Sequence, residues 1–231
     1  MSGPTAPEAP ALAEDLLLLL FDPRSGTIAG EGSSLFHTLA GAVLVDLALQ
    51  GRIDVDEHAT WSGREVRVVA DDPPSDPLLR DVWDRVARRP ADVHSLVLEV
   101  GPPLRARVID RVVERGHLAR EGGRTLGLFT TTALVDGGTS RRANLLAPVR
   151  AALVDGDTPE PRTAARAALL AASGGLPALH QDIPWSGAVY TRGRELQRGD
   201  WGAEEVGEPV RRTMAGLVAS NLFVTAFVAT D

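Results

Sequence analysis

The sequence contains no cysteine and no lysine. The missing cysteine excludes disulfides, thiol catalysis and cysteine-ligated metals. All 24 basic residues are arginine, which together with the abundant alanine and glycine favours a GC-rich, prokaryotic coding genome. The formal net charge of -7 argues against a surface built for nucleic-acid binding, although one local basic site for a phosphate headgroup remains compatible with it.

Long hydrophobic runs are also missing. The apolar run at 16–21 is too short to span a membrane, and no positively charged signal-peptide region precedes it. The apolar stretch 214–229 falls below the roughly 18 residues of a spanning helix and contains polar Ser220, Asn221 and Thr225. We therefore expect no transmembrane segment, a buried final helix and a cytoplasmic protein.

Hydrophobic spacing predicts a mainly α-helical chain. Apolar residues at Leu35, Leu39, Val43 and Leu47 recur at helical intervals, and Gly51 stands where a helix C-cap belongs. The other predicted helices are a short apolar helix or strand near 16–21, a helix beginning at Asp76-Pro77, and helices at about 92–99, 102–116, 140–154, 158–173 and 204–229.

Two small β-hairpins interrupt the predicted helices. Ile53 and Val55 alternate with charged residues, and Val66 and Val68 do so again after a turn. The second hairpin covers about 117–133, with Gly122-Gly123 expected at its tip. With 231 residues available for a substantial core, we expect a flexible tail at 1–10 and one domain at 11–231.

Patterns typical of catalysis or metal binding are weak or missing. The scattered histidines form no close metal-ligand spacing, and residues 54–58 favour a solvated turn over a metal site. Residues 30–35 lack the third glycine of a dinucleotide-binding loop, and neither GxSxG nor a P-loop occurs. We expect no enzyme activity, no cofactor and no metal.

Arginines gather in the predicted helix 102–116. Arg105 lies near its predicted start, where free backbone N–H groups favour an anion, and Arg107 and Arg111 follow. The alternative is a solvated helix face in which these arginines pair with Asp110 and Glu114.

Two further segments carry unusual side chains. The hairpin strand with Leu126, Leu128 and Phe129 is apolar enough for self-association or membrane contact, although it could simply pack on the helices. The segment 183–201 combines aromatic residues with arginines, which suits an interfacial or phosphate site, but a loop fastened against the core is the favoured interpretation. Its aromatic and basic residues are Trp185, Tyr190, Arg192, Arg194 and Trp201.

An ordered set of motifs resembles the Golgi phosphoprotein 3 family over about 11–231. The motifs are "EDLLLLLFDPRSG", the pattern from Leu39 to Ile53, the pattern from Arg105 to Leu118, "LFTTT", "RAALLAAS" and "VASNLFVTAFVATD". The resemblance implies a helical bundle core ringed by amphipathic helices. It also implies a non-enzymatic adaptor that binds phosphatidylinositol 4-phosphate (PI4P) on cytosolic membrane faces and self-associates through its apolar hairpin.

The positions of the family's lipid pocket are largely substituted in this chain. A tryptophan of the family corresponds to Glu31, one arginine corresponds to Ala40, and the first of two arginines on a helix corresponds to Pro102. Only the second of that pair remains, as Arg105. Headgroup specificity is therefore expected to be changed or lost unless other arginines supply the charge; the candidates are Arg107, Arg192 and Arg194.

The leading hypothesis is thus a non-enzymatic, peripheral membrane protein with an anionic headgroup as its ligand. The alternative is a soluble protein–protein adaptor or homo-oligomeric scaffold that uses the apolar hairpin. An enzyme built around Trp185–Trp201 is the third and weakest hypothesis, because no nucleophile–base pair supports it.

Overall fold

The computed structural model describes residues 10–32, 34–56, 64–125, 129–201 and 208–220. The predicted tail 1–10 lies almost wholly outside these ranges, as do Leu126, Leu128 and the end of the predicted last helix. In the described part of the chain, no helix is long and apolar enough to cross a membrane.

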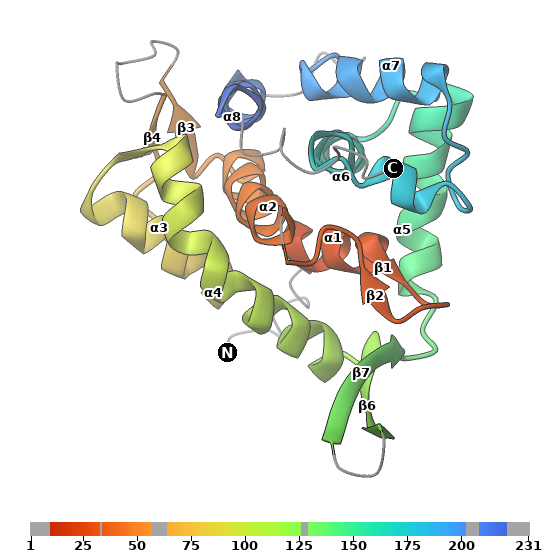
Figure 1. Ribbon diagram of the computed structural model, residues 1–231. Helices are drawn as coiled ribbons and strands as arrows, with labels where there is room; N and C mark the ends of the chain where they lie inside the picture. Colours follow the sequence, from red (N-terminus) through yellow and green to blue (C-terminus); the bar gives the residue numbers. More distant parts are fainter. Residues whose placement is uncertain (1–9, 33, 57–63, 126–128, 202–207, 221–231) are drawn as a thin grey trace, which may run out of the picture.

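The molecule is mainly helical with small antiparallel strand pairs, so the predicted fold class is confirmed (Figure 1). The helices are α1 (Leu12–Leu20), α2 (Leu35–Leu49), α3 (Pro77–Arg88), α4 (Val93–Glu114), α5 (Arg141–Arg150), α6 (Pro161–Ala172), α7 (Gly187–Gln197) and α8 (Glu208–Ala219). A π-helical turn, η1 (Ala151–Asp155), extends α5, and a 3-10 turn, η2 (Leu176–Leu179), follows α6. The strands are β1 (Phe21–Asp22), β2 (Thr27–Ile28), β3 (Ile53–Val55), β4 (Glu65–Val68), β5 (Ala91–Asp92), β6 (Leu118–Thr125) and β7 (Phe129–Asp136).

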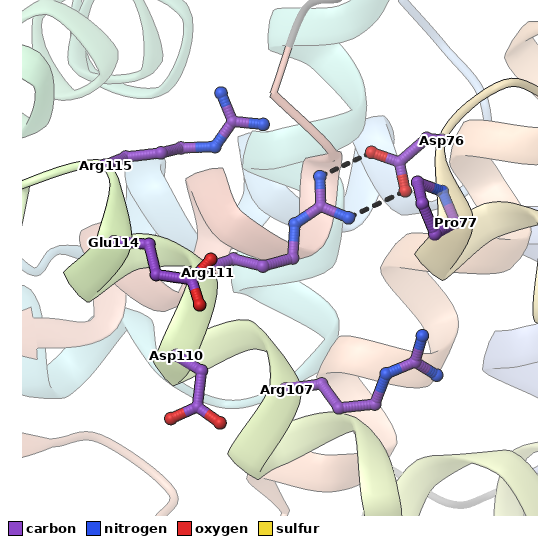
Figure 2. A pocket seen from close by; sticks show the side chains of 7 residues that line it. All are labelled: Asp76, Pro77, Arg107, Asp110, Arg111, Glu114 and Arg115. Carbon is purple, nitrogen blue, oxygen red and sulfur yellow. Dashed lines mark hydrogen bonds and ion pairs between the residues drawn. The ribbon is translucent and has the colours of Figure 1, made fainter.

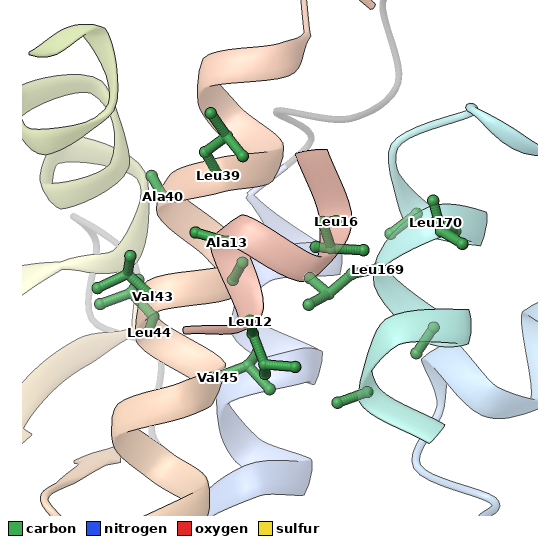
Figure 3. Close-up of a cluster of buried hydrophobic side chains, with 14 of the residues drawn as sticks. Leu12, Ala13, Leu16, Leu39, Ala40, Val43, Leu44, Val45, Leu169 and Leu170 are labelled. Carbon is green, nitrogen blue, oxygen red and sulfur yellow. The ribbon is translucent and has the colours of Figure 1, made fainter. Parts of the chain in front are cut away.

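Helices α1 and α2 form the centre of the core (Figures 1 and 3). Every residue of α1 is buried, and the helix packs against α2, α4, α5 and α6. On α2, Leu39, Ala40 and Val43 are fully buried, which agrees with the predicted helix that is apolar nearly all round. Gly51 follows α2 with a φ of 65°, the left-handed conformation predicted for its C-cap.

The first predicted hairpin is confirmed and belongs to a slightly larger sheet. Strands β3 and β4 pair in antiparallel register, with Ile53 opposite Val68 and Val55 opposite Val66. The two residues of β5 add a third strand, which the hydrophobic pattern of the sequence does not predict.

Helix α4 corrects the prediction of two separate helices at 92–99 and 102–116. It is one continuous helix with Pro102 and Pro103 in its interior. Both proline rings are exposed, while Leu96, Leu104 and Val108 continue one buried stripe through the proline pair. Tertiary burial of this stripe outweighs the roughly 3 kcal/mol that an interior proline costs. Consequently Arg105 lies in mid-helix, and the predicted helix start with free N–H groups is wrong.

The second hairpin, β6–β7, follows α4 and extends away from the helical body (Figure 1). The predicted tip at Gly122-Gly123 is wrong, because Gly122 pairs with Thr132 and Gly123 pairs with Thr131 inside the strand ladder. The connection between the strands falls at 126–128, outside the described residues. Gly122 and Gly123 therefore lie within strand β6 and do not form the turn.

Candidate anionic-ligand surface on helix α4

The outer face of α4 carries an apolar strip. The helix buries Leu104 and Val108 against the core, so the residues on the opposite side face outward. This strip consists of Leu98, Pro102, Pro103 and Ala106, all of which are exposed, and it is interrupted by exposed Glu99, which pairs with Arg85 of α3 at 2.6 Å. Leu98 alone is 43% exposed, one of the few large apolar side chains left open to solvent in the described chain.

An arginine stands on each flank of this strip, and each is held by a carboxylate from another element. Arg105 forms an ion pair with Glu31 from the loop before α2. Arg107 pairs with Asp81 of α3 at 2.7 Å. Both arginine side chains are about two-fifths exposed, at 43% and 41%. The predicted alternative of pairing with Asp110 and Glu114 is wrong for both.

The positions that the resemblance assigns to a lipid pocket are only partly in place. Glu31 and Arg105 meet on the surface beside exposed Pro102. Ala40 is fully buried within α2 and presents no surface to a ligand. Arg105, the one arginine that remains at the pocket positions, is thus paired with the carboxylate of Glu31.

A pocket of about 600 Å³ adjoins Arg107 at the C-terminal half of α4 (Figure 2). Its lining consists of Asp76, Pro77, Arg107, Asp110, Arg111, Glu114 and Arg115. Arginines at intervals of four residues line one side because they recur on one face of α4. Each stands beside acidic neighbours, so the lining alternates in charge.

Arg111 is a structural residue of this pocket and is not free to bind a ligand. Its guanidinium donates to both carboxylate oxygens of Asp76, with one distance of 2.8 Å, and lies 2.9 Å from Glu14. The hydrogen bonds that Arg111 donates to Asp76 raise the pKa of Arg111. Burial alone would raise the pKa of Asp76, but Arg111 and the backbone N–H groups of Leu78 and Leu79 bring it below its ordinary value.

Arg115 also lines this pocket and is a cation that was not among the predicted site residues. Its Nε lies 2.8 Å from a carboxylate oxygen of buried Glu14, and the side chain remains 38% exposed. The repeat of arginine at 107, 111 and 115 was visible in the sequence and could have identified it. The buried partner Glu14 could not have been identified, because it comes from α1 at the other end of the sequence.

The structure does not bring Arg192 and Arg194 to this surface. Both lie on α7, which packs against α6 on the other side of α1 and α2 from α4 (Figure 1). Arg192 donates to the carbonyl oxygen of Ala152 and pairs with Glu195 at 3.1 Å. Arg194 is exposed. Neither can supply a replacement charge beside Arg105.

The remaining candidate residues fall into two places. Phe129 begins β7, while Leu126 and Leu128 lie outside the described residues. In the segment 183–201, Trp201 is buried and donates from Nε1 to the carbonyl oxygen of Leu196 at 2.7 Å, which fastens the loop as expected. Trp185 and Tyr190 remain exposed. Within the described ranges, no group of three or more acidic or histidine side chains has the arrangement of a metal site.

The family relationship agrees with this fold. The model of the Golgi phosphoprotein 3 (GPP34) family matches residues 12–213, from the first residue of α1 to within α8. No curated protein matches the chain. Because the matched region spans most of the 231 residues, the chain belongs to the Golgi phosphoprotein 3 family.

Proposed function

We propose that this protein is a non-enzymatic, peripheral membrane protein that binds anionic headgroups through the outer face of α4. The observation that supports this proposal is the apolar strip at Leu98, Pro102, Pro103 and Ala106, flanked by Arg105 and Arg107. An apolar strip between cations suits the boundary between lipid headgroups and acyl chains. Family membership supports the same function.

The ligand would bind by exchange of partners. Exposed ion pairs such as Arg105–Glu31 and Arg107–Asp81 contribute only about 0 to 1 kcal/mol, so they hold the arginines weakly. A phosphate monoester carries more charge than a carboxylate and accepts bidentate hydrogen bonds from a guanidinium. PI4P carries such a monoester, whereas phosphatidylserine offers a phosphodiester and a carboxylate. The cytoplasmic face of a membrane presents anionic lipids of both kinds.

The test is co-sedimentation with vesicles of neutral lipid, of neutral lipid with phosphatidylserine, and of neutral lipid with PI4P. Arg105→Ala should lower the affinity for anionic vesicles about fivefold, since one arginine near a membrane surface contributes about 1 kcal/mol. Glu31→Gln should raise the affinity, because it releases Arg105 from its competing carboxylate. The matched control is Arg150→Ala, which removes an arginine of equal exposure on α5 that is also ion-paired.

Selective binding to PI4P vesicles would show that the family's specificity survives with one pocket arginine. Equal binding to all anionic vesicles, weakening with salt, would indicate a general electrostatic surface. The proposal fails if the protein ignores every anionic vesicle at low salt, or if Arg150→Ala weakens binding as much as Arg105→Ala.

A second candidate function is a homo-oligomeric scaffold or protein adaptor built on the β6–β7 hairpin. The favouring observation is that β6 and β7 pair only with each other among the described strands, in a two-stranded sheet that projects from the body (Figure 1). Such a sheet is marginally stable alone and offers two open edges for pairing.

Light scattering tests the scaffold function. Phe129→Asp should convert a self-associated parent into a monomer, because a carboxylate in an interface between two hairpins would lose its hydration. Thr131→Asp in the same strand serves as the comparison for the effect of charge alone. If Phe129→Asp keeps the oligomeric state of the parent, the hairpin is not the self-association surface.

A further inference from the structure

Helix α7 and its C-cap residue carry two exposed arginines, Arg194 and Arg198. Most of its arginines are held by carboxylates, including those on α4, α5 and α6. Arg194 and Arg198 are exposed, and no ion pair or side-chain hydrogen bond holds either of them within the described chain. Glu195, the acid next to Arg194 in the sequence, pairs with Arg192 instead. Two exposed cations thus lie one helical turn apart on this part of the described surface.

Two exposed aromatic side chains lie on α7 and just before it, on the N-terminal side of these arginines. Trp185 and Tyr190 are 44% and 54% exposed, and their ring centroids lie 6.1 Å apart in an edge-to-face arrangement. Tyr190, Arg194 and Arg198 are spaced by four residues, so they share one face of α7. This α7 ridge (Trp185, Tyr190, Arg194 and Arg198) therefore joins an aromatic end to a cationic end.

The α7 ridge stands on a rigid support. The side chain of Ser186 caps the helix by accepting from the N–H of Val189 at 3.2 Å. At Gly193 the helix approaches α6 so closely that an added Cβ would lie 2.9 Å from Cβ of Ala171. Buried Trp201 fixes the far end by its bond to Leu196. A surface fixed in advance loses little conformational entropy when a partner binds.

We propose that the α7 ridge is a docking surface for a short acidic segment of a partner protein. Tryptophan, tyrosine and arginine are the residue types that dominate binding energy in protein interfaces. The guanidinium groups of Arg194 and Arg198 would bind carboxylates of the segment. The rings of Trp185 and Tyr190 would contact an apolar or proline side chain beside those carboxylates. From Tyr190 to Arg198 the helix rises about 12 Å, the length of roughly four extended residues.

The position of the α7 ridge allows it to act independently of the α4 surface. Helices α1 and α2 separate α7 from α4, so a membrane bound at α4 would leave α7 facing solution (Figure 1). The inference therefore does not depend on lipid binding at Arg105 and could hold in a protein that binds no membrane.

An array of synthetic octapeptides, in which the number of glutamates and the central apolar or proline residue vary, tests the proposal. The parent protein should retain acidic peptides and ignore the matching glutamine peptides, and 1 M salt should abolish retention. The double variant Arg194→Glu/Arg198→Glu should lose at least about tenfold in affinity, since it replaces two attracting charges with two repelling ones. Tyr190→Ala should weaken binding of the peptides with an apolar centre.

The matched control is Arg89→Glu, which reverses an exposed arginine at the C-cap of α3, where no carboxylate forms an ion pair with it in the described chain. It should leave peptide binding unchanged. The proposal is overturned if no acidic peptide distinguishes the parent from the double variant. It is also overturned if the double variant loses binding to phosphatidylserine vesicles but not to peptides, because the α7 ridge would then be a membrane face.

Discussion

At the scale of single residues, the buried carboxylates determine where arginine is needed. Glu14, Asp15, Asp46 and Asp76 are each at most 3% exposed, and each meets at least one arginine. An isolated buried carboxylate would cost several kcal/mol, so every one of these acids requires a partner of good geometry. The planar guanidinium directs two parallel N–H groups at the two carboxylate oxygens, a fixed geometry that a lysine ammonium does not have.

Asp76 gives the clearest prediction at this scale. It caps α3 by accepting from the N–H of Leu78 at 2.7 Å and also binds Arg111. Asp76→Ala should lower the free energy of unfolding at pH 7 by about 3 to 5 kcal/mol, because it leaves Arg111 without half of its partners. Asp72→Ala, at a carboxylate that is 79% exposed and paired with Arg52, should lower the free energy of unfolding far less.

The pH dependence of this effect has a definite sign. The pKa of Asp76 is lower in the folded protein than its ordinary value of 3.8, so the unfolded chain takes up the proton first as the pH falls. The stabilisation from Asp76 is complete above that ordinary value and is lost as the pH falls through the folded value. Urea unfolding at pH 7 and near pH 3 should therefore show a smaller difference between parent and variant in acid. A difference that is constant with pH would contradict the ion pair.

At the scale of elements, α4 shows why the predicted helices differ from the observed one. Pro102-Pro103 carries the signal of a helix start, and local propensity favours a break there. The outcome depended instead on burial against α2, and that contact cannot be seen in the sequence. The same limit applies to the hairpin, where Gly122 and Gly123 indicated a turn but pair within the ladder.

The element-scale prediction concerns the approach of α4 to α2 at Gly101. A Cβ added there would lie 2.8 Å from Cδ2 of Phe36 and 3.0 Å from its carbonyl oxygen. Since the carbonyl cannot move without displacing α2, Gly101→Ala should destabilise by about 1 to 3 kcal/mol despite the better helix propensity of alanine. Thermal unfolding measures the loss.

Gly187→Ala is the matched control, because Gly187 begins α7 with open space around its Cα. It should leave the melting temperature unchanged or slightly higher. Equal effects at the two positions would mean that the close approach of α4 to α2 contributes nothing to stability.

At the scale of the whole molecule, the sequence predicted the helical class, the buried helix α2 and the first hairpin, because each follows from a local period. The candidate site was predictable only in part. Arg105 and Arg107 were identified, but Glu31 and Asp81 approach them through the tertiary fold. Arg192 and Arg194 of α7 were expected to add charge to this site, but the tertiary fold places them elsewhere.

The same long-range ion pairs connect the whole molecule around α1. Asp15 is fully buried and receives Arg166 of α6 at 3.0 and 2.8 Å, and Arg141 of α5 also binds it. One carboxylate near the start of the chain thus joins three helices. Because Arg166 is itself largely buried, loss of Asp15 would leave an unpaired charge inside the protein.

We therefore predict that Asp15→Ala lowers the free energy of unfolding by about 3 to 5 kcal/mol. The double variant Asp15→Ala/Arg166→Ala should be more stable than the sum of the single effects implies, since removing both partners avoids the uncompensated charge. Denaturant unfolding of the four proteins measures this coupling. The exposed pair Arg150–Asp155 provides the control cycle, in which we expect a coupling below about 1 kcal/mol. Additive effects at Asp15 and Arg166 would mean that apolar packing alone joins α6 to α1, and that the buried arginines only fill space.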